Sequence, residues 1–188
     1  MKIVLPENIS DITLEQYQRY YKLLLRDDLT ELNFNKRKIE IFTGLPYRKV
    51  KDISHKDYAE ILKQIDTALN VDSAFKNTFT LNGIDYGFIP NFDKITTAEY
   101  VDLSTFGTDI ETLEKTMAVL FRKVTKKDKF GNYQIEYYDG TEEKAEVMKD
   151  APLNIVNGAL VFFYSLAKEL RNNIQRFTVP PQPKEMIH

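Results

Sequence analysis

The sequence predicts an α+β protein that is mainly α-helical, with two β-hairpins packed around a long C-terminal helix. Three observations lead to this fold class. Apolar residues recur at helical spacing over residues 152–177. Several other helical patterns open with Ser or Thr followed three residues later by Glu, Gln or Asp, as capped helices do. Two segments with alternating apolar residues each surround a turn signal that contains Gly and Asn, which is typical of β-hairpins.

The long helix over residues 152–177 is the element around which the prediction is organised. One row of apolar residues is spaced alternately by three and four positions, which places the row on one helical face: Leu153, Val156, Leu160, Phe163, Ala167, Leu170 and Ile174. A second apolar row runs beside it: Ile155, Ala159, Phe162 and Leu166. With Val161 and Tyr164 on the remaining side, the middle is apolar nearly all round. We therefore expect a core helix on which the other elements pack.

Further helices are expected in the N-terminal third of the chain. Thr13 and the Gln three positions later form a capping box at the start of the first. The second covers residues 33–43, and Gly44 stands at its expected stop. A short helical turn at residues 47–52 follows. Ser54 then opens a third helix with a clean apolar stripe.

Both hairpins are predicted after residue 74. Residues 75–90 contain Asn82-Gly83, the strongest short signal for a hairpin turn, between two alternating arms. The second hairpin has arms at residues 121–125 and 133–138, which flank a charged loop.

The remaining elements are short helices. Thr96 with Glu99 and Thr108 with Glu111 are two further capping boxes, so we expect a short helix and then a longer one between the hairpins. Residues 141–150 are expected to form a polar helix or turn.

Length and composition favour one domain. A chain of 188 residues that is 43% apolar can build one core, so we assign residues 1–178 to a single α+β domain and residues 179–188 to an extended tail that contains proline. The net charge of −2 offers no basic excess for nucleic acid, and the absence of cysteine excludes disulfide and thiolate chemistry. The apolar part of the first residues is too short for a signal peptide, and no apolar run is long enough to span a membrane.

Reactive side chains are few and scattered. The two histidines offer no catalytic triad, no paired-histidine metal site and no histidine–carboxylate pair. The isolated glycines form no phosphate-binding loop. We therefore predict no catalytic, cofactor or metal site and a protein that is not an enzyme. The alternative is a divalent ion held by some of five carboxylates: Asp93, Glu99, Asp102, Asp109 and Glu111.

The charged loop of the second hairpin is the most basic segment. It contains Lys123, Lys126, Lys127 and Lys129 near Phe130. Such a loop could contact an acidic partner or a nucleic-acid backbone, or serve solubility alone. The negative net charge makes a nucleic-acid partner the less favoured of these.

Aromatic residues supply the candidate partner-binding surface, because Tyr and Phe anchor interfaces well. Six residues are predicted to contact a partner: Phe130, Tyr133, Tyr137, Tyr138, Val161 and Tyr164. The competing interpretation is cross-strand packing in the second hairpin, and burial of the helix residues by the hairpins.

Several stretches resemble small proteins of tailed phages that are known as tail assembly chaperones. These stretches are residues 12–18 (ITLEQYQ), 86–92 (YGFIPNF), 99–103 (EYVDL), 117–122 (MAVLFR) and 158–163 (GALVFF), the last ahead of Glu169-Leu170. They extend over nearly the whole chain. Each is a packing pattern and none is a catalytic motif.

The resemblance implies a non-enzymatic assembly factor. Tail assembly chaperones bind the long, helical tape-measure protein and keep it soluble while tail subunits polymerise around it. We therefore expect phage structural proteins as partners, such as a tape-measure or tail-tube protein, in the host cytoplasm. No membrane or cofactor is expected, and self-association stays open. Because this chain is larger than many such chaperones and has two hairpins, a structural component of the virion, such as a connector, tail or capsid-associated subunit, is the alternative.

Overall fold

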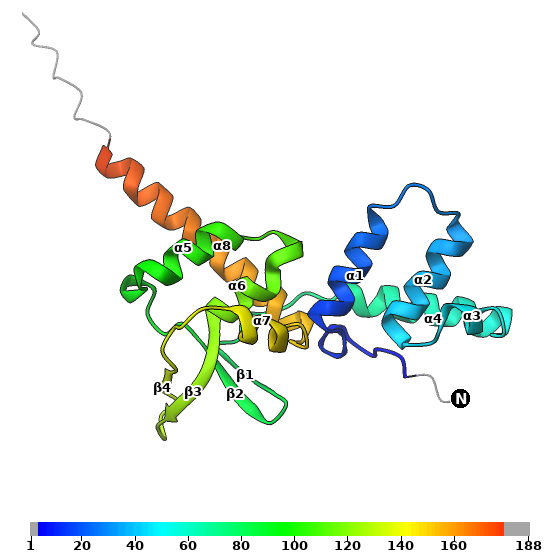
Figure 1. Cartoon of the computed structure of the whole chain (residues 1–188), viewed down its shortest axis with the longest axis horizontal. Coiled ribbons are helices and arrows are strands. Elements are labelled where there is room, and N and C mark those ends of the chain that lie inside the picture. The colour runs from blue at the N-terminus through cyan, green and yellow to red at the C-terminus, as the bar shows by residue number, and fades with distance from the viewer. Residues whose placement is uncertain (1–3, 179–188) are drawn as a thin grey trace, which may run out of the picture.

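The computed structural model describes the backbone of residues 4–178 and the side chains of residues 4–165. The predicted tail at residues 179–188 lies outside the described residues. Helices and one four-stranded antiparallel sheet make up the chain, so the α+β class is confirmed. Figure 1 shows helices α1 to α4 gathered on one side of the molecule and the sheet on the other, with α6, α7 and the first turns of α8 between them.

The N-terminal third forms the helical side. Its elements are the 3-10 turn η1 (Ile9–Asp11) and helices α1 (Leu14–Leu24), α2 (Glu31–Thr43), α3 (Tyr47–Val50) and α4 (His55–Leu69). The capping box at Thr13 is confirmed, because Thr13 Oγ1 accepts from the Gln16 amide at 3.2 Å and Gln16 Oε1 from the Thr13 amide at 3.0 Å. Helix α2 begins earlier than predicted because Thr30 caps it, and Gly44 ends it at φ 69°.

The four strands are β1 (Thr78–Leu81), β2 (Ile84–Phe88), β3 (Phe121–Lys127) and β4 (Tyr133–Ile135), in the order β1-β2-β3-β4. Asn82 and Gly83 form the predicted turn, both with positive φ, at 50° and 77°. The prediction of two hairpins packed around the long helix is not confirmed. Instead β2 pairs with β3, with Tyr86 opposite Lys123 and Phe88 opposite Phe121, so that all four strands share one sheet.

Short helices connect the strands and cover the sheet. They are the 3-10 turns η2 (Phe92–Lys94) and η3 (Ile110–Thr112) and helices α5 (Thr97–Phe106), α6 (Leu113–Leu120) and α7 (Glu142–Met148). The capping box of Thr96 and Glu99 is confirmed at the start of α5. The one predicted at Thr108 is wrong, because Asp109 caps η3 instead and the helix proper starts at Leu113. An aspartate next to the expected cap competes successfully, since its carboxylate also accepts amide hydrogens.

Helix α8 (Leu153–Thr178) is a core element only over its first turns, which corrects the expectation that everything else packs on it. Leu153, Val156 and Ala159 are fully buried, whereas Val161 is 65% and Tyr164 55% exposed. Beyond these turns the helix runs away from the rest of the molecule in Figure 1. The apolar middle of the helix therefore does not indicate burial within this chain.

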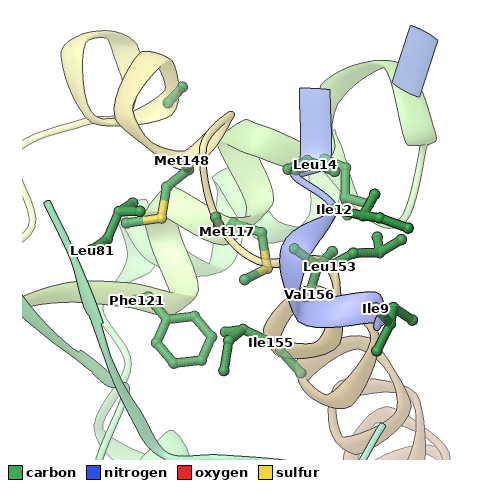
Figure 2. Close-up of a cluster of buried hydrophobic side chains, with 14 of the residues drawn as sticks. Ile9, Ile12, Leu14, Leu81, Met117, Phe121, Met148, Leu153, Ile155 and Val156 are labelled. Atoms are coloured by element: carbon green, nitrogen blue, oxygen red, sulfur yellow. The ribbon is translucent and has the colours of Figure 1, made fainter. Parts of the chain in front are cut away.

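Helix α6 and the start of β3 occupy the centre in its place, because every residue from Thr116 to Phe121 is buried. The buried residues of the helical side and of the sheet side belong to one cluster. Figure 2 shows side chains converging there from η1, α1, α6, α7, α8 and the sheet: Ile9, Ile12, Leu14, Leu81, Met117, Phe121, Met148, Leu153, Ile155 and Val156.

Candidate protein-binding surface

A cluster of phenylalanine rings forms where α8 leaves the core. Phe75 precedes β1, and its ring stacks on that of Phe162 in α8 with centroids 4.3 Å apart. The ring of Phe88, at the end of β2, stands edge-on to both, at 4.9 Å from Phe75 and 5.5 Å from Phe162. Phe92 lies 5.5 Å from Phe88 on the other side. Edge-on and stacked pairs of this kind add to the stabilisation from buried area, so the cluster holds its shape.

This cluster walls a hollow of about 380 Å³, which we call the aromatic groove. Its lining consists of Phe75, Asn77, Phe88, Ile89, Pro90, Asn91, Phe92, Asp93, Tyr133 and Phe162. The walls are mostly apolar, and Asn77, Asn91 and Asp93 provide the polar groups. An apolar groove with a few polar groups is suited to an apolar side chain of another molecule and not to a charged substrate.

The exposed side of α8 begins directly beside the groove. Phe162 is a groove residue that is still 37% exposed, and its neighbours Val161 and Tyr164 are more exposed. We call these three residues the α8 surface. Large apolar side chains that are exposed this close together often mark a site of interaction with another protein.

Tyr133 is the part of the predicted surface that closes the groove. Its hydroxyl donates to the carbonyl oxygen of Phe88 at 2.8 Å and lies 3.1 Å from that of Asn77. Its ring covers Gly87, where a Cβ would come within 2.4 Å of the ring, so only glycine fits under it. Burial raises the pKa of Tyr133. Tyr133 is therefore held in place as a wall of the groove.

Tyr138 belongs to an internal polar network. Its hydroxyl bonds to Asp102, and the Arg122 guanidinium carbon lies 5.6 Å from the centre of its ring. Burial, followed by the Asp102 contact, raises its pKa. Arg122 also forms an ion pair with Glu99, and both of these side chains are buried. Tyr138 is thus half-buried, and its hydroxyl is engaged with Asp102 of α5.

Phe130 and Tyr137 are the most exposed members of the predicted surface, at 79% and 95%. Both lie on the β3–β4 side of the molecule and neither lines the aromatic groove. The six predicted residues therefore do not form one patch. Val161, Tyr164 and Tyr133 gather at the groove and α8, Phe130 and Tyr137 lie elsewhere, and Tyr138 is half-buried against α5.

The sequence interpretation overlooked Phe75, Phe92 and Phe162 as surface residues. Phe162 was assigned to a buried row because its spacing matches that row. Phe75 and Phe92 stand outside the alternating arms of the hairpin, so no periodicity marked them. The one available signal was the density of phenylalanine at residues 75–92.

The five carboxylates considered for a metal site have other partners or positions. Glu99 pairs with Arg122, Asp102 with Tyr138, and Glu111 lies 3.7 Å from Lys22. Asp109 caps η3, and Asp93 is the middle residue of η2. Among the residues that the structure describes, no group of three or more His, Cys, Asp or Glu side chains could hold a metal ion.

Comparisons with protein families, with curated proteins and with solved structures gave no match. In the part of the chain that the structure describes, no helix combines the length and the apolar character needed to cross a membrane.

Proposed function

We propose that this chain is a non-enzymatic assembly factor that binds an amphipathic helix of another protein along the α8 surface and in the aromatic groove. The observation that carries the proposal is that the α8 surface and the aromatic groove share one residue. The exposed Val161, Phe162 and Tyr164 lie on a helix that runs away from the body, and Phe162 is also a wall of the groove. A partner helix beside α8 would place one side chain in the groove, which is the helix-in-groove mode of recognition.

The magnitudes are adequate for a specific but reversible contact. Removing about 200 Å² of apolar surface from water is worth about 5 kcal/mol at about 25 cal/mol per Å². Lost translational and rotational freedom offsets much of this gain, so a useful affinity requires the walls of the aromatic groove as well as the three exposed residues.

The resemblance to tail assembly chaperones suggests which proteins carry the helix. A tape-measure protein is a long helical chain whose apolar stripe would aggregate without cover, and a tail-tube protein is the second choice. On this proposal the chain acts in the cytoplasm of an infected host cell. A stable place in the virion is the alternative, and it would use the same surface for a permanent contact.

The test is a titration of the purified chain with a fluorescent peptide that copies a helical repeat of the tape-measure protein encoded in the same genome. A double substitution, Val161→Asp with Tyr164→Asp, should weaken binding by at least about tenfold, since each charge must be desolvated at the interface. Leu24→Asp with Leu25→Asp is the matched control, because these two residues are also exposed but lie at the end of α1.

Equal affinity of the two double variants would contradict the proposal, as would the absence of any binding by the unaltered chain. Analysis of purified particles separates the two roles. An assembly factor is absent from the finished particle, whereas a virion component is present in fixed ratio to the tail or capsid proteins.

A further inference from the structure

The β3–β4 hairpin carries a cluster of lysines, with Lys126, Lys127 and Lys129 at its tip and Lys123 nearer the start of β3, opposite Tyr86 of β2. Lys123, Lys126, Lys127 and Lys129 are all exposed. Among the described residues, none of the four ammonium groups has a carboxylate oxygen within 4.0 Å, although lysines elsewhere in the chain, such as Lys149, form ion pairs. The chain is acidic overall, so this concentration of charge is a local feature of the hairpin.

The acidic residue in the same loop is engaged in building the turn. Asp128 accepts hydrogen bonds from the amides of Phe130 at 2.8 Å and Asn132 at 2.9 Å, and from the Asn132 side chain at 2.7 Å. The Asp128 amide in turn donates to the Asn132 carbonyl at 2.9 Å. Asp128 therefore fixes the loop conformation and leaves the neighbouring lysines free to face a partner.

An aromatic ring stands among these charges. Phe130 is 79% exposed, and the Lys129 ammonium lies 5.1 Å from the centre of its ring. Beside it, a hollow of about 560 Å³ is lined by Lys126, Lys127, Asn132 and Tyr133, together with Asp128 and Gln134. Open rings and lysines in alternation are what proteins use on single-stranded nucleic acids, where a base stacks on the ring and ammonium groups meet the phosphates.

We propose that the β3–β4 hairpin tip binds single-stranded nucleic acid, with Phe130 stacking on a base and Lys126, Lys127 and Lys129 contacting phosphates. An acidic protein is the competing partner for such a charge. Protein interfaces, however, surround a contiguous apolar centre and are depleted in lysine. Here a single exposed ring is surrounded by lysines. This inference goes beyond the proposed protein-binding function. The two proposed sites have Tyr133 in common and no other residue.

The experiment is fluorescence anisotropy with a labelled oligothymidylate and the full chain, between about 50 and 200 mM salt. Three phosphate contacts on a single strand predict a slope of log affinity against log salt of about −2, at about −0.7 for each contact. Phe130→Ala should weaken binding by about 5- to 150-fold, the range for losing one stacked base.

Two double variants separate the hairpin from general charge effects. Lys126→Glu with Lys127→Glu should abolish most binding. Lys56→Glu with Lys63→Glu makes the same change in net charge on α4, on the opposite side of the molecule in Figure 1, and should bind nearly as well as the unaltered chain. Both control lysines are exposed. Circular dichroism spectra that match the unaltered chain show that the variants are folded.

Several results would overturn the inference. They are no binding at the lowest salt, equal loss in the two double variants, or unchanged affinity of Phe130→Ala. Equal affinity for a duplex of the same length would refute the single-strand preference. Tighter binding of a polyglutamate peptide than of the oligonucleotide would assign the hairpin to an acidic protein instead.

Discussion

The buried ion pair between Arg122 and Glu99 is expected to stabilise the contact of α5 with the sheet, and a single atom change can test it. Arg122 lies on β3 and Glu99 in the first turn of α5, 23 positions earlier in the sequence. Both side chains are buried, so water cannot replace the lost partner if one charge is removed. Replacing Glu99 by Gln removes the charge and keeps the shape of the side chain.

The substitution leaves the cap in place but changes the contact with Arg122. Glu99 Oε2 accepts from the Thr96 amide at 2.6 Å, and the single oxygen of Gln can serve at that position of a capping box, which leaves its NH2 group facing the Arg122 guanidinium, donor to donor. What remains is a buried guanidinium without a counter-charge, and its Nε already lacks a hydrogen-bond partner within the described part of the chain. Breaking a buried pair in this way costs about 3–5 kcal/mol, so Glu99→Gln should cost at least about 3 kcal/mol.

The assay is urea unfolding at neutral pH, followed by circular dichroism. Adding Arg122→Met removes the stranded charge, so the double variant should be more stable than Glu99→Gln alone by at least about 1 kcal/mol. Glu146→Gln is the control, because its partner Lys149 forms an exposed pair at 2.6 Å worth less than about 1 kcal/mol. A loss below about 1 kcal/mol for Glu99→Gln would refute the reasoning, as would a double variant no more stable than the single one.

Two further predictions concern the core and its response to pH. Phe121→Ala should lower the free energy of unfolding by about 3–5 kcal/mol, because the ring is fully buried and stands edge-on to Phe79 and Phe88. Phe163→Ala should lower it less, because Phe163 is only partly buried. Denaturant titration of both variants measures the difference, and a larger loss for Phe163→Ala would contradict the prediction. Burial raises the pKa of Tyr86, Tyr133 and Tyr138. Since a raised folded-state pKa favours the neutral phenol, the resulting stability should be constant below about pH 10, the unfolded value, and fall as pH rises above it. Thermal melts across this range should show a shallower alkaline decline for Tyr138→Phe, and an equally steep decline would exclude Tyr138 as a cause.

Helix starts and tight turns could be predicted because the interactions that define them are local. The capping boxes at Thr13 and Thr96 join groups three residues apart, and Asn82-Gly83 adopts positive φ without help from distant residues. The error at Thr108 has a local cause too, since Asp109 offered an equally good cap one position later.

The candidate site was harder to predict, because a periodic pattern shows which side chains share a face and not what covers that face. The spacing predicts that Phe162 belongs to a buried row, and it leaves open whether Val161 and Tyr164 are buried by the hairpins or contact a partner. In the structure all three are at least partly exposed, and Phe162 is covered in part by Phe75. No spacing rule relates Phe75 to Phe162, which are far apart in the chain.

By itself, the sequence determined the kind and approximate position of the helices and strands, since caps, turns and apolar periodicity act within a few residues. Only the tertiary structure decided that β2 pairs with β3 to make one sheet, that α6 occupies the centre, and that α8 leaves the body. The physical reason is that these outcomes depend on which arrangement of apolar surfaces buries the most area for the chain as a whole. That competition involves residues from the whole chain, as the close approach of Gly158 in α8 to the backbone of Ala74 illustrates.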